Sequence, residues 1–167
     1  MRREQPEARA EFFRRYAPQV RRILFLQGFC EEVDDAVQEV FIKVYRARLP
    51  SEVTFLGWFY RLILNTGRDQ GRRRKTRYGT LEKLRQTATA GVADAPVEPL
   101  DPALRRALAG LTPELRECVA LRYFADLPLD EIAAAQEVPV GTVKSRLHGA
   151  VKRLRETLQE SGFERDA

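Results

Sequence analysis

Apolar residues recur at intervals of three and four along most of the chain, which is the period of an amphipathic helix. In the first half this pattern predicts a helix over about residues 8–26, a second from Val33 to Val44 and a third beginning near Phe55. The positions that carry it are Phe12, Phe13, Tyr16, Val20, Ile23 and Leu24, then Val33, Val37, Val40, Phe41 and Val44, then Phe55, Trp58, Phe59 and Leu62. The alternation of apolar and polar residues that is typical of a β-strand nowhere continues long enough to predict one. The predicted fold class is therefore all-α.

Helix-start signals mark the second half. Asp101 precedes Pro102 and Thr112 precedes Pro113, and each pair combines a capping side chain with proline at the first helical position. The pattern predicts four helices, over residues 102–109, 113–124, 129–136 and 140–158.

Between these halves the composition changes. Residues 88–102 are mostly Ala, Gly, Pro, Val and Asp, with three prolines and no aromatic residue, which is typical of an interdomain linker. The sequence therefore predicts two small helical domains, over residues 8–78 and 102–160, joined by a flexible linker over residues 79–101.

The charge is unevenly distributed. The chain of 167 residues carries 29 Lys and Arg against 24 Asp and Glu, for a net charge of +5. Residues 61–77 alone hold seven basic residues and one acid, net +6, which leaves −1 for the rest. Residues 29–39 carry five acids and no base, whereas residues 142–155 carry five bases and no acid. This segregation favours a nucleic-acid partner for the basic segments.

Composition also limits which disulfides, metal sites and cofactors we expect. Two cysteines and one histidine support neither a disulfide framework nor a Cys/His zinc cluster, so we expect no metal, no cofactor and a reducing, cytoplasmic environment. The N-terminus has basic residues without an apolar stretch behind them, and no window holds 18 consecutive apolar residues. We therefore expect no signal peptide and no membrane insertion.

The last two predicted helices have the spacing of a helix-turn-helix. A short helix through Ile132 is followed by a tight turn near Glu137 and by Gly141, which opens the longer helix. A buried stripe of Val143, Leu147, Val151, Leu154 and Leu158 would turn the polar residues toward DNA. The candidate DNA contacts are Gly141, Thr142, Lys144, Ser145, Arg146, His148 and Lys152. The structural alternative is a solvated basic helix on a Leu and Val core.

The run Leu-Thr-Pro-Glu-Leu-Arg-Glu-Cys-Val-Ala-Leu-Arg-Tyr-Phe over residues 111–124, together with residues 130–133 and 139–148, is similar to the C-terminal domain of a known family, the ECF group of bacterial RNA polymerase sigma factors. Residues 34–41 and 55–61, followed by Asn65, Asp69 and the arginines at 72–74, are similar to its N-terminal domain. The resemblance implies a factor without catalytic activity that binds core polymerase, directs it to promoters and assists promoter opening. It also implies an anti-sigma partner.

The resemblance implies roles for individual residues. An acidic helix face, with Phe41 beside it, would bind a basic coiled coil of the polymerase beta-prime subunit. Binding to core polymerase would involve both the beta and the beta-prime subunits. The candidate polymerase-binding residues are Asp34, Asp35, Gln38, Glu39 and Phe41. The loop at residues 46–54 and the basic segment would hold minus-ten promoter DNA, both duplex and flipped nontemplate strand, and the helix-turn-helix would read the minus-thirty-five duplex. The candidate contacts to the minus-ten element, in the loop and the basic segment, are Ser51, Glu52, Thr54, Arg61, Asn65, Arg68, Arg72, Arg73, Arg74 and Lys75. Trp58 could stack on a base, but its helical spacing with Phe55 and Leu62 favours burial.

The chain departs from the family pattern at the turns. Gln136-Glu137 stands where Leu-Gly is usual, so a residue with a side chain is expected at a position that often needs positive φ. Asp126 and Pro128 replace a common Gly and Ser; Asp tolerates the left-handed conformation, whereas Pro128 removes a capping hydroxyl. Gly149 replaces a frequent Arg, which removes one possible DNA contact.

Two other functions stay open at this point. A stand-alone helix-turn-helix regulator would use only the C-terminal half and would not need the acidic face. A nuclease or recombinase would need clustered carboxylates for metal ions or an activated nucleophile. Asp34, Asp35 and Glu39 lie apart from the basic segment with no histidine near them in sequence, which disfavours the enzyme.

Overall fold

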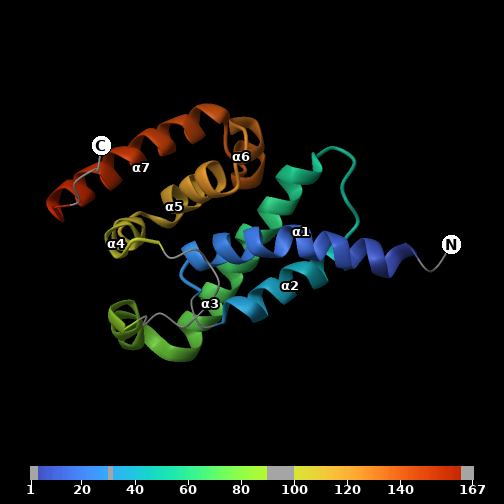
Figure 1. The fold of residues 1–167 in the computed structure, drawn as a ribbon, viewed down its shortest axis with the longest axis horizontal. Helices are drawn as coiled ribbons and strands as arrows, with labels where there is room; N and C mark the ends of the chain where they lie inside the picture. Colours follow the sequence, from blue (N-terminus) through green and yellow to red (C-terminus); the bar gives the residue numbers. More distant parts are fainter. Residues whose placement is uncertain (1–3, 30–31, 90–99, 163–167) are drawn as a thin grey trace.

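The computed structural model describes the backbone of residues 4–29, 32–89 and 100–162, and the side chains of residues 6–29, 32–76 and 100–162. Every regular element in these ranges is a helix, as predicted (Figure 1). The elements are α1 (Glu4–Leu26), α2 (Val33–Arg46), α3 (Phe55–Thr89), α4 (Pro102–Ala109), α5 (Pro113–Val119), the π-helical turn η1 (Ala120–Phe124), α6 (Leu129–Gln136) and α7 (Val140–Glu160).

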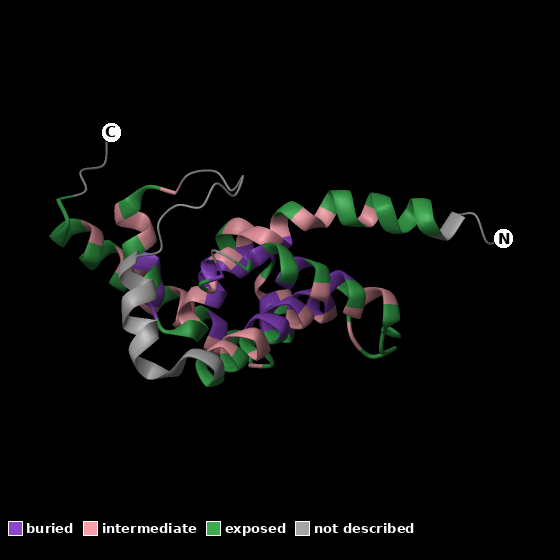
Figure 2. Ribbon diagram, turned by 90° about the horizontal axis from the view of Figure 1, so that it is seen from below, coloured by how far each residue is buried: buried purple, intermediate pink, exposed green. Residues whose placement is uncertain are grey.

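The first three helices form the N-terminal group, in which α2 and α3 pack against α1. The predicted apolar stripes meet in its core, where Val20, Ile23 and Leu24 are buried with residues of α2 and α3. At one end the core is aromatic, because the ring of Phe12 lies 5.5–5.8 Å from those of Phe41, Phe55 and Phe59. The buried residues occupy the centre of Figure 2, where the helices meet. This packing fixes which faces of α2 and α3 remain exposed.

The N-terminal helices differ from the predicted bounds in two places. Helix α1 begins at Glu4 and includes Pro18, and it ends before Gly28, whose φ is +103°. Helix α3 continues to Thr89, so it occupies the first part of the segment predicted as linker. No proline occurs between Pro50 and Pro96 to stop it. Residues 90–99 of the predicted linker lie outside the described residues.

The C-terminal group consists of α4 to α7. The carboxylate of Asp101 caps α4 by accepting hydrogen bonds from the backbone N–H groups of Ala103 at 2.7 Å and Leu104 at 3.4 Å. Thr112 is at the N-cap of α5, but its side chain makes no capping hydrogen bond, so that part of the prediction is wrong. The predicted helix over 113–124 changes to π-helical geometry after Val119. The N–H of Ala125 accordingly bonds the carbonyl of Ala120, at 3.1 Å.

Helix α6 has the predicted bounds, and α7 begins where it was expected. The buried stripe of α7 is narrower than predicted, because only Val143 and Ala150 are buried and the four leucine and valine positions after Val143 are partly exposed. Each helix in the described part of the chain is too short or too polar to span a membrane.

The two groups also pack on each other. Helix α3 lies along α6, and α1 contacts η1 and α5. Buried residues from both groups, including Phe59 and Ile63 on one side and Leu127 and Ile132 on the other, belong to one continuous apolar cluster. Figure 1 shows the first turns of α3 beside α6, with α7 beyond. The residues predicted to bind DNA along α3 therefore lie next to the C-terminal group.

Candidate nucleic-acid interface

The acidic face of α2 is only partly open to solvent. Asp34, Asp35 and Gln38 are exposed, and Asp34 pairs with Arg21 of α1. Glu39 turns toward α3 and is 24% exposed. Its carboxylate lies 2.8 Å from Nζ of Lys43, accepts a hydrogen bond from Gln70 and is 4.0 Å from Arg73. Glu39 therefore joins α2 to α3 instead of standing free for a partner.

The environment of Glu39 lowers the pKa of its carboxyl group. Burial on its own would raise the pKa of this carboxyl group, but the hydrogen bonds from Lys43 and Gln70 and the charges of Lys43 and Arg73 outweigh it. The pKa is consequently below the ordinary value of 4.5. The ionised form is the one that the contact between α2 and α3 uses.

Phe41 does not belong to the exposed face. It is 2% exposed, and its ring packs 4.7 Å from Phe13 and 5.7 Å from Phe12. The placement of Phe41 in a surface contact is wrong in this structure. Its helical spacing with Val37 and Val40, which predicted burial, is the stronger signal because all three line the same face of α2.

One stripe of α3 collects five of the ten predicted minus-ten contacts. Its members follow one another at intervals of three or four residues and therefore share a face of the helix; they are Arg61, Asn65, Arg68, Arg72 and Lys75. Asn65, Arg72 and Lys75 are exposed, and Arg72 pairs with Asp69 on the same helix. This stripe is the basic surface most suitable for phosphate groups.

Two further arginines, among the described side chains of the basic segment, point elsewhere. Arg73 lies toward Glu39 of α2, and Arg74 donates to the carbonyl of Gly28 at 3.4 Å. Both residues sit about one-third of a turn or more from the basic stripe of α3, since successive helical residues are separated by about 100°. The segment is therefore divided between a DNA-suited face and contacts within the N-terminal group.

The loop before α3 is exposed at Ser51 and Glu52. The hydroxyl of Thr54 instead donates to Glu131 of α6 at 2.5 Å and accepts from the N–H of Gly57 at 3.2 Å. Trp58 is half-buried, packs against the core and lies 6.0 Å from the ring of Phe55. Its position agrees with the expected packing role.

Acidic side chains of the C-terminal group hold two arginines of the basic stripe. Arg61 donates to Glu137 at 3.1 Å. Arg68 makes a two-pronged contact with Glu117, from Nε to Oε1 at 3.0 Å and from Nη2 to Oε2 at 2.5 Å. Glu117 is 2% exposed and also accepts from Gln27 at 3.2 Å. These hydrogen bonds raise the pKa of the Arg68 guanidinium above its ordinary value.

The helix-turn-helix has the expected local geometry. Glu137 adopts the left-handed conformation, with φ 55° and ψ 44°, and the N–H of Val138 bonds the carbonyl of Ala133 at 3.0 Å. Asp126 also has φ of 55°. Pro128 precedes α6 without a side-chain cap, as its missing hydroxyl predicted. The two unusual residues thus occupy the positive-φ positions without changing the fold.

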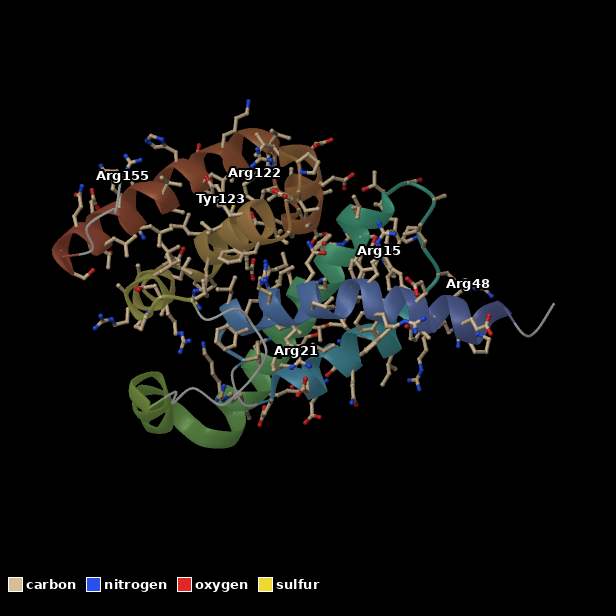
Figure 3. All side chains as sticks on the ribbon, viewed as in Figure 1. Arg15, Arg21, Arg48, Arg122, Tyr123 and Arg155 are labelled. Carbon is tan, nitrogen blue, oxygen red and sulfur yellow. The ribbon has the colours of Figure 1, made fainter. Side chains whose placement is uncertain are left out.

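The start of α7 presents most of its predicted DNA contacts to solvent. The exposed members are Gly141, Lys144, Ser145, His148 and Lys152, and Thr142 is half-buried. Farther along the same helix, Arg155 projects outward (Figure 3). Arg146 is the exception, because it donates to the side-chain oxygen of Gln136 at 3.1 Å. Five of the seven predicted contacts are therefore exposed to solvent.

Comparison with known proteins identifies the family. Residues 12–77 match the family Sigma-70 region 2, and residues 102–154 match Sigma-70, region 4. The ECF RNA polymerase sigma-E factor of Escherichia coli is 34% identical over 133 residues, which cover 71% of this chain and 70% of that protein. The chain belongs to the ECF sigma factors. The SigE factor of Mycolicibacterium smegmatis is 32% identical over 92% of this chain, which spans 63% of the length of that relative.

Two solved structures resemble the whole arrangement in fold. The sigma factor RpoE in complex with the anti-sigma factor NepR from Bartonella quintana has a TM-score of 0.70 at 20% identity, over 90% of this chain and 96% of that chain. CnrH in complex with the cytosolic domain of CnrY has a TM-score of 0.68 at 22% identity, over 93% of this chain and 90% of that chain. At these identities the likeness concerns the fold.

Sequence reasoning about this ECF sigma factor missed the acids that face α3. Glu117 and Glu131 come from the second half of the chain and were not singled out, and Glu137 was noted only for its place in the turn. Sequence reasoning also gave Gly57 no role, yet this residue of α3 packs against Ala134 of α6. A glycine at a buried helical position could have indicated close approach of another element, but not which element.

Proposed function

We propose that this chain is an alternative sigma factor that binds core RNA polymerase through its beta and beta-prime subunits, directs it to specific promoters and assists promoter opening. The observation that carries the proposal is the presence of sigma-70 regions 2 and 4, in that order, on the two helical groups. A stand-alone regulator would use only α4 to α7 and would leave region 2 without a purpose.

The exposed part of the α2 face is suited to polymerase. Asp35 and Gln38 are accessible on adjacent turns, and a carboxylate pairs with arginine in a fixed two-pronged geometry. Asp34 would exchange Arg21 for an arginine of the beta-prime coiled coil. Glu39 would contribute to polymerase binding indirectly, because its contact with Lys43 helps to keep α2 against α3.

Promoter DNA would contact two basic surfaces. The start of α7 would enter the major groove of the minus-thirty-five element, with Lys144 and Ser145 nearest the bases and Lys152 nearer the phosphates. The basic stripe of α3 and the loop before it would hold the minus-ten element and its displaced strand. We expect the logarithm of the affinity to fall by roughly 0.9 per unit of log salt for each phosphate neutralised.

Membership of the family also suggests where the chain acts and which partner regulates it. Sigma factors are initiation factors and not enzymes, and this one would act on polymerase in the cytoplasm. Two structural neighbours are complexes, one of the sigma factor RpoE with the anti-sigma factor NepR and one of CnrH with the cytosolic domain of CnrY. We propose that an anti-sigma partner likewise binds this chain.

Run-off transcription with core polymerase and a promoter library tests the proposal. We expect the chain to direct transcripts that core enzyme alone does not make, and the double variant Asp35→Arg with Gln38→Arg to lose polymerase binding while keeping its helical content. The matched control is Glu156→Arg with Gln159→Arg, which changes another exposed acid–Gln pair, on α7. Output unchanged by the α2 variant would favour the stand-alone regulator.

A further inference from the structure

The exposed face of α2 carries a large apolar side chain to which the proposed function assigns no role. Ile42 is 47% exposed. It lies four residues after Gln38 and seven after Asp35, so the three side chains share one face of the helix. Phe41 points about 100° away from Ile42 and is buried. The apolar surface on this face therefore comes from Ile42 and not from Phe41.

Packing within the chain does not account for an isoleucine at this position. The valines of α2 that line the core are 0–3% exposed, whereas about half of Ile42 faces solvent. Isoleucine is also a poorer helix former than alanine or leucine, because its β-branch restricts the side-chain rotamers in a helix. Single exposed apolar residues are common on protein surfaces, so the surroundings of Ile42 decide what it indicates.

Polar and charged side chains surround Ile42. Asp35 and Gln38 precede it on the same face, Arg46 follows it one turn later, and all three are exposed. A small apolar centre with a polar and charged rim is the usual arrangement of a protein–protein interface. Within such an interface, a few central side chains that become fully desolvated supply most of the binding energy. Ile42 has the position of such a central residue.

A second apolar side chain borders this face at the seam between α1 and α2. Phe13 of α1 is 40% exposed, and its ring lies 4.7 Å from that of Phe41. Farther along the same seam, Arg21 of α1 pairs with Asp34 of α2. The apolar surface available to a partner therefore extends from α2 onto α1, with charged side chains beside it.

We propose that Ile42 is the apolar anchor of the contact between α2 and core polymerase. The partner segment, the beta-prime coiled coil of the proposed function, would place an apolar side chain on Ile42 beside the arginine that pairs with Asp35. The inference rests on the proposed function and adds a residue to the same site. A second copy of this chain is the poorer occupant, because a two-fold interface would set the acids of one α2 face against those of the other.

Binding of the full chain to core polymerase in the absence of DNA tests the inference. Ile42→Ala removes the anchor, whereas Ile42→Leu keeps an apolar side chain of the same volume. The control is Leu49→Ala, because Leu49 has nearly the same exposure, 48%, but lies beyond the end of α2 in the loop that the proposed function assigns to DNA. Asp35→Asn supplies the charge-dependent comparison. Fluorescence anisotropy of the labelled chain gives the dissociation constants, at about 0.1 M salt and again at about 0.4 M salt.

We expect Ile42→Ala to weaken binding about tenfold at both salt concentrations, which corresponds to about 1.4 kcal/mol, because apolar burial does not depend on charge screening. The loss caused by Asp35→Asn should be larger at low salt than at high salt. Ile42→Leu should retain most of the affinity, and Leu49→Ala should bind as the wild type does. The variants should keep the wild-type melting temperature, because these positions are exposed. If Ile42→Ala melts earlier, Ile42→Gln replaces it, since glutamine is a good helix former without an apolar end.

Equal affinities of Ile42→Ala and the wild type would overturn the inference, as would a loss that fades at high salt like that of Asp35→Asn. A wild-type dimer in sedimentation velocity that Ile42→Ala dissociates would assign the face to a second copy and would overturn it as well. If the wild type itself does not bind core polymerase, the proposed function is wrong and the inference falls with it. If the wild type directs promoter-specific transcription and Ile42→Ala binds core polymerase equally well, the function stands and the anchor is wrong.

Discussion

Gln136 and Arg146 are joined by a hydrogen bond of 3.1 Å that crosses the helix-turn-helix, from the Arg146 guanidinium to the Gln136 side-chain oxygen. The side-chain nitrogen of Gln136 donates in turn to the backbone carbonyl of Glu114, at 3.1 Å. Gln136 is 7% exposed. One buried amide thus connects the end of α6 with α5 and with the recognition helix α7.

Replacing this amide should destabilise the C-terminal group. We expect Gln136→Ala to lower the free energy of unfolding by about 1–3 kcal/mol, because it leaves a carbonyl and a guanidinium without their partner. Urea denaturation followed by circular dichroism measures the change. Gln38→Ala, at an exposed helical position, is the control and should change stability by less than about 0.5 kcal/mol. Equal effects of the two substitutions would show that the Gln136 bridge contributes nothing.

The conformation of Glu137 gives a second prediction. Its φ of 55° is unfavourable for a residue with a Cβ, whereas glycine adopts it freely. Glu137→Gly and Glu137→Ala both remove the carboxylate that pairs with Arg61, so their difference isolates the backbone. We expect the Gly variant to be more stable than the Ala variant by about 1 kcal/mol.

Thermal unfolding of the two Glu137 variants checks this prediction. Asp126, which has the same φ of 55°, allows an internal comparison, and Asp126→Gly should likewise be more stable than Asp126→Ala. Equal melting temperatures within each Gly/Ala pair would mean that the turns relax at no cost.

Much of the fold could be predicted because its signals are local. The bounds of α6 and the start of α7 follow from the apolar spacing around Ile132 and Val143. The π-helical turn at 120–124 could not be predicted, because its register depends on how α5 packs against neighbouring helices. The extension of α3 was missed although its sequence carries no proline, since composition alone was used to place the linker.

The candidate site likewise has features that could be predicted from the sequence and features that could not. Exposed residues at the start of α7 could be predicted because a helix-turn-helix motif fixes their face. The pairing of Arg68 with Glu117 joins residues 49 positions apart in the sequence, and no periodicity indicates such a contact. Phe41 shows the reverse case, in which helical spacing predicted burial correctly and the family pattern suggested a surface role.

The two caps of the C-terminal group give a third prediction. Asp101→Ala should cost about 1 kcal/mol, because the carboxylate accepts hydrogen bonds from two backbone N–H groups at the start of α4. Thr112→Ala should cost less, because the Thr112 side chain makes no capping hydrogen bond. Both sites precede a proline at the first helical position, so each variant is a control for the other. Denaturant midpoints in which Thr112→Ala is the more damaging change would contradict the observed cap geometry.

The carboxylate of Glu39 gives a prediction about acid stability. Its pKa in the folded chain is below the ordinary value of 4.5: burial opposes ionisation, but the contacts with Lys43, Gln70 and Arg73 more than compensate. A group whose pKa is lowered by folding stabilises the protein above its unfolded pKa, and this contribution disappears as the pH falls through the folded pKa. The contribution of Glu39 should therefore be complete at neutral pH and decrease from about pH 5 downward.

Denaturant unfolding of the wild type and Glu39→Gln at a series of pH values measures that contribution. Glutamine keeps the size of the side chain and its capacity to accept hydrogen bonds but has no charge to titrate. We expect Glu39→Gln to be less stable than the wild type at neutral pH and the gap to narrow as the solution becomes acidic. Glu52→Gln removes an exposed carboxylate from the turn before α3 and should leave the wild-type profile unchanged. A gap that stays constant with pH would mean that the ionised Glu39 carboxylate is not what ties α2 to α3.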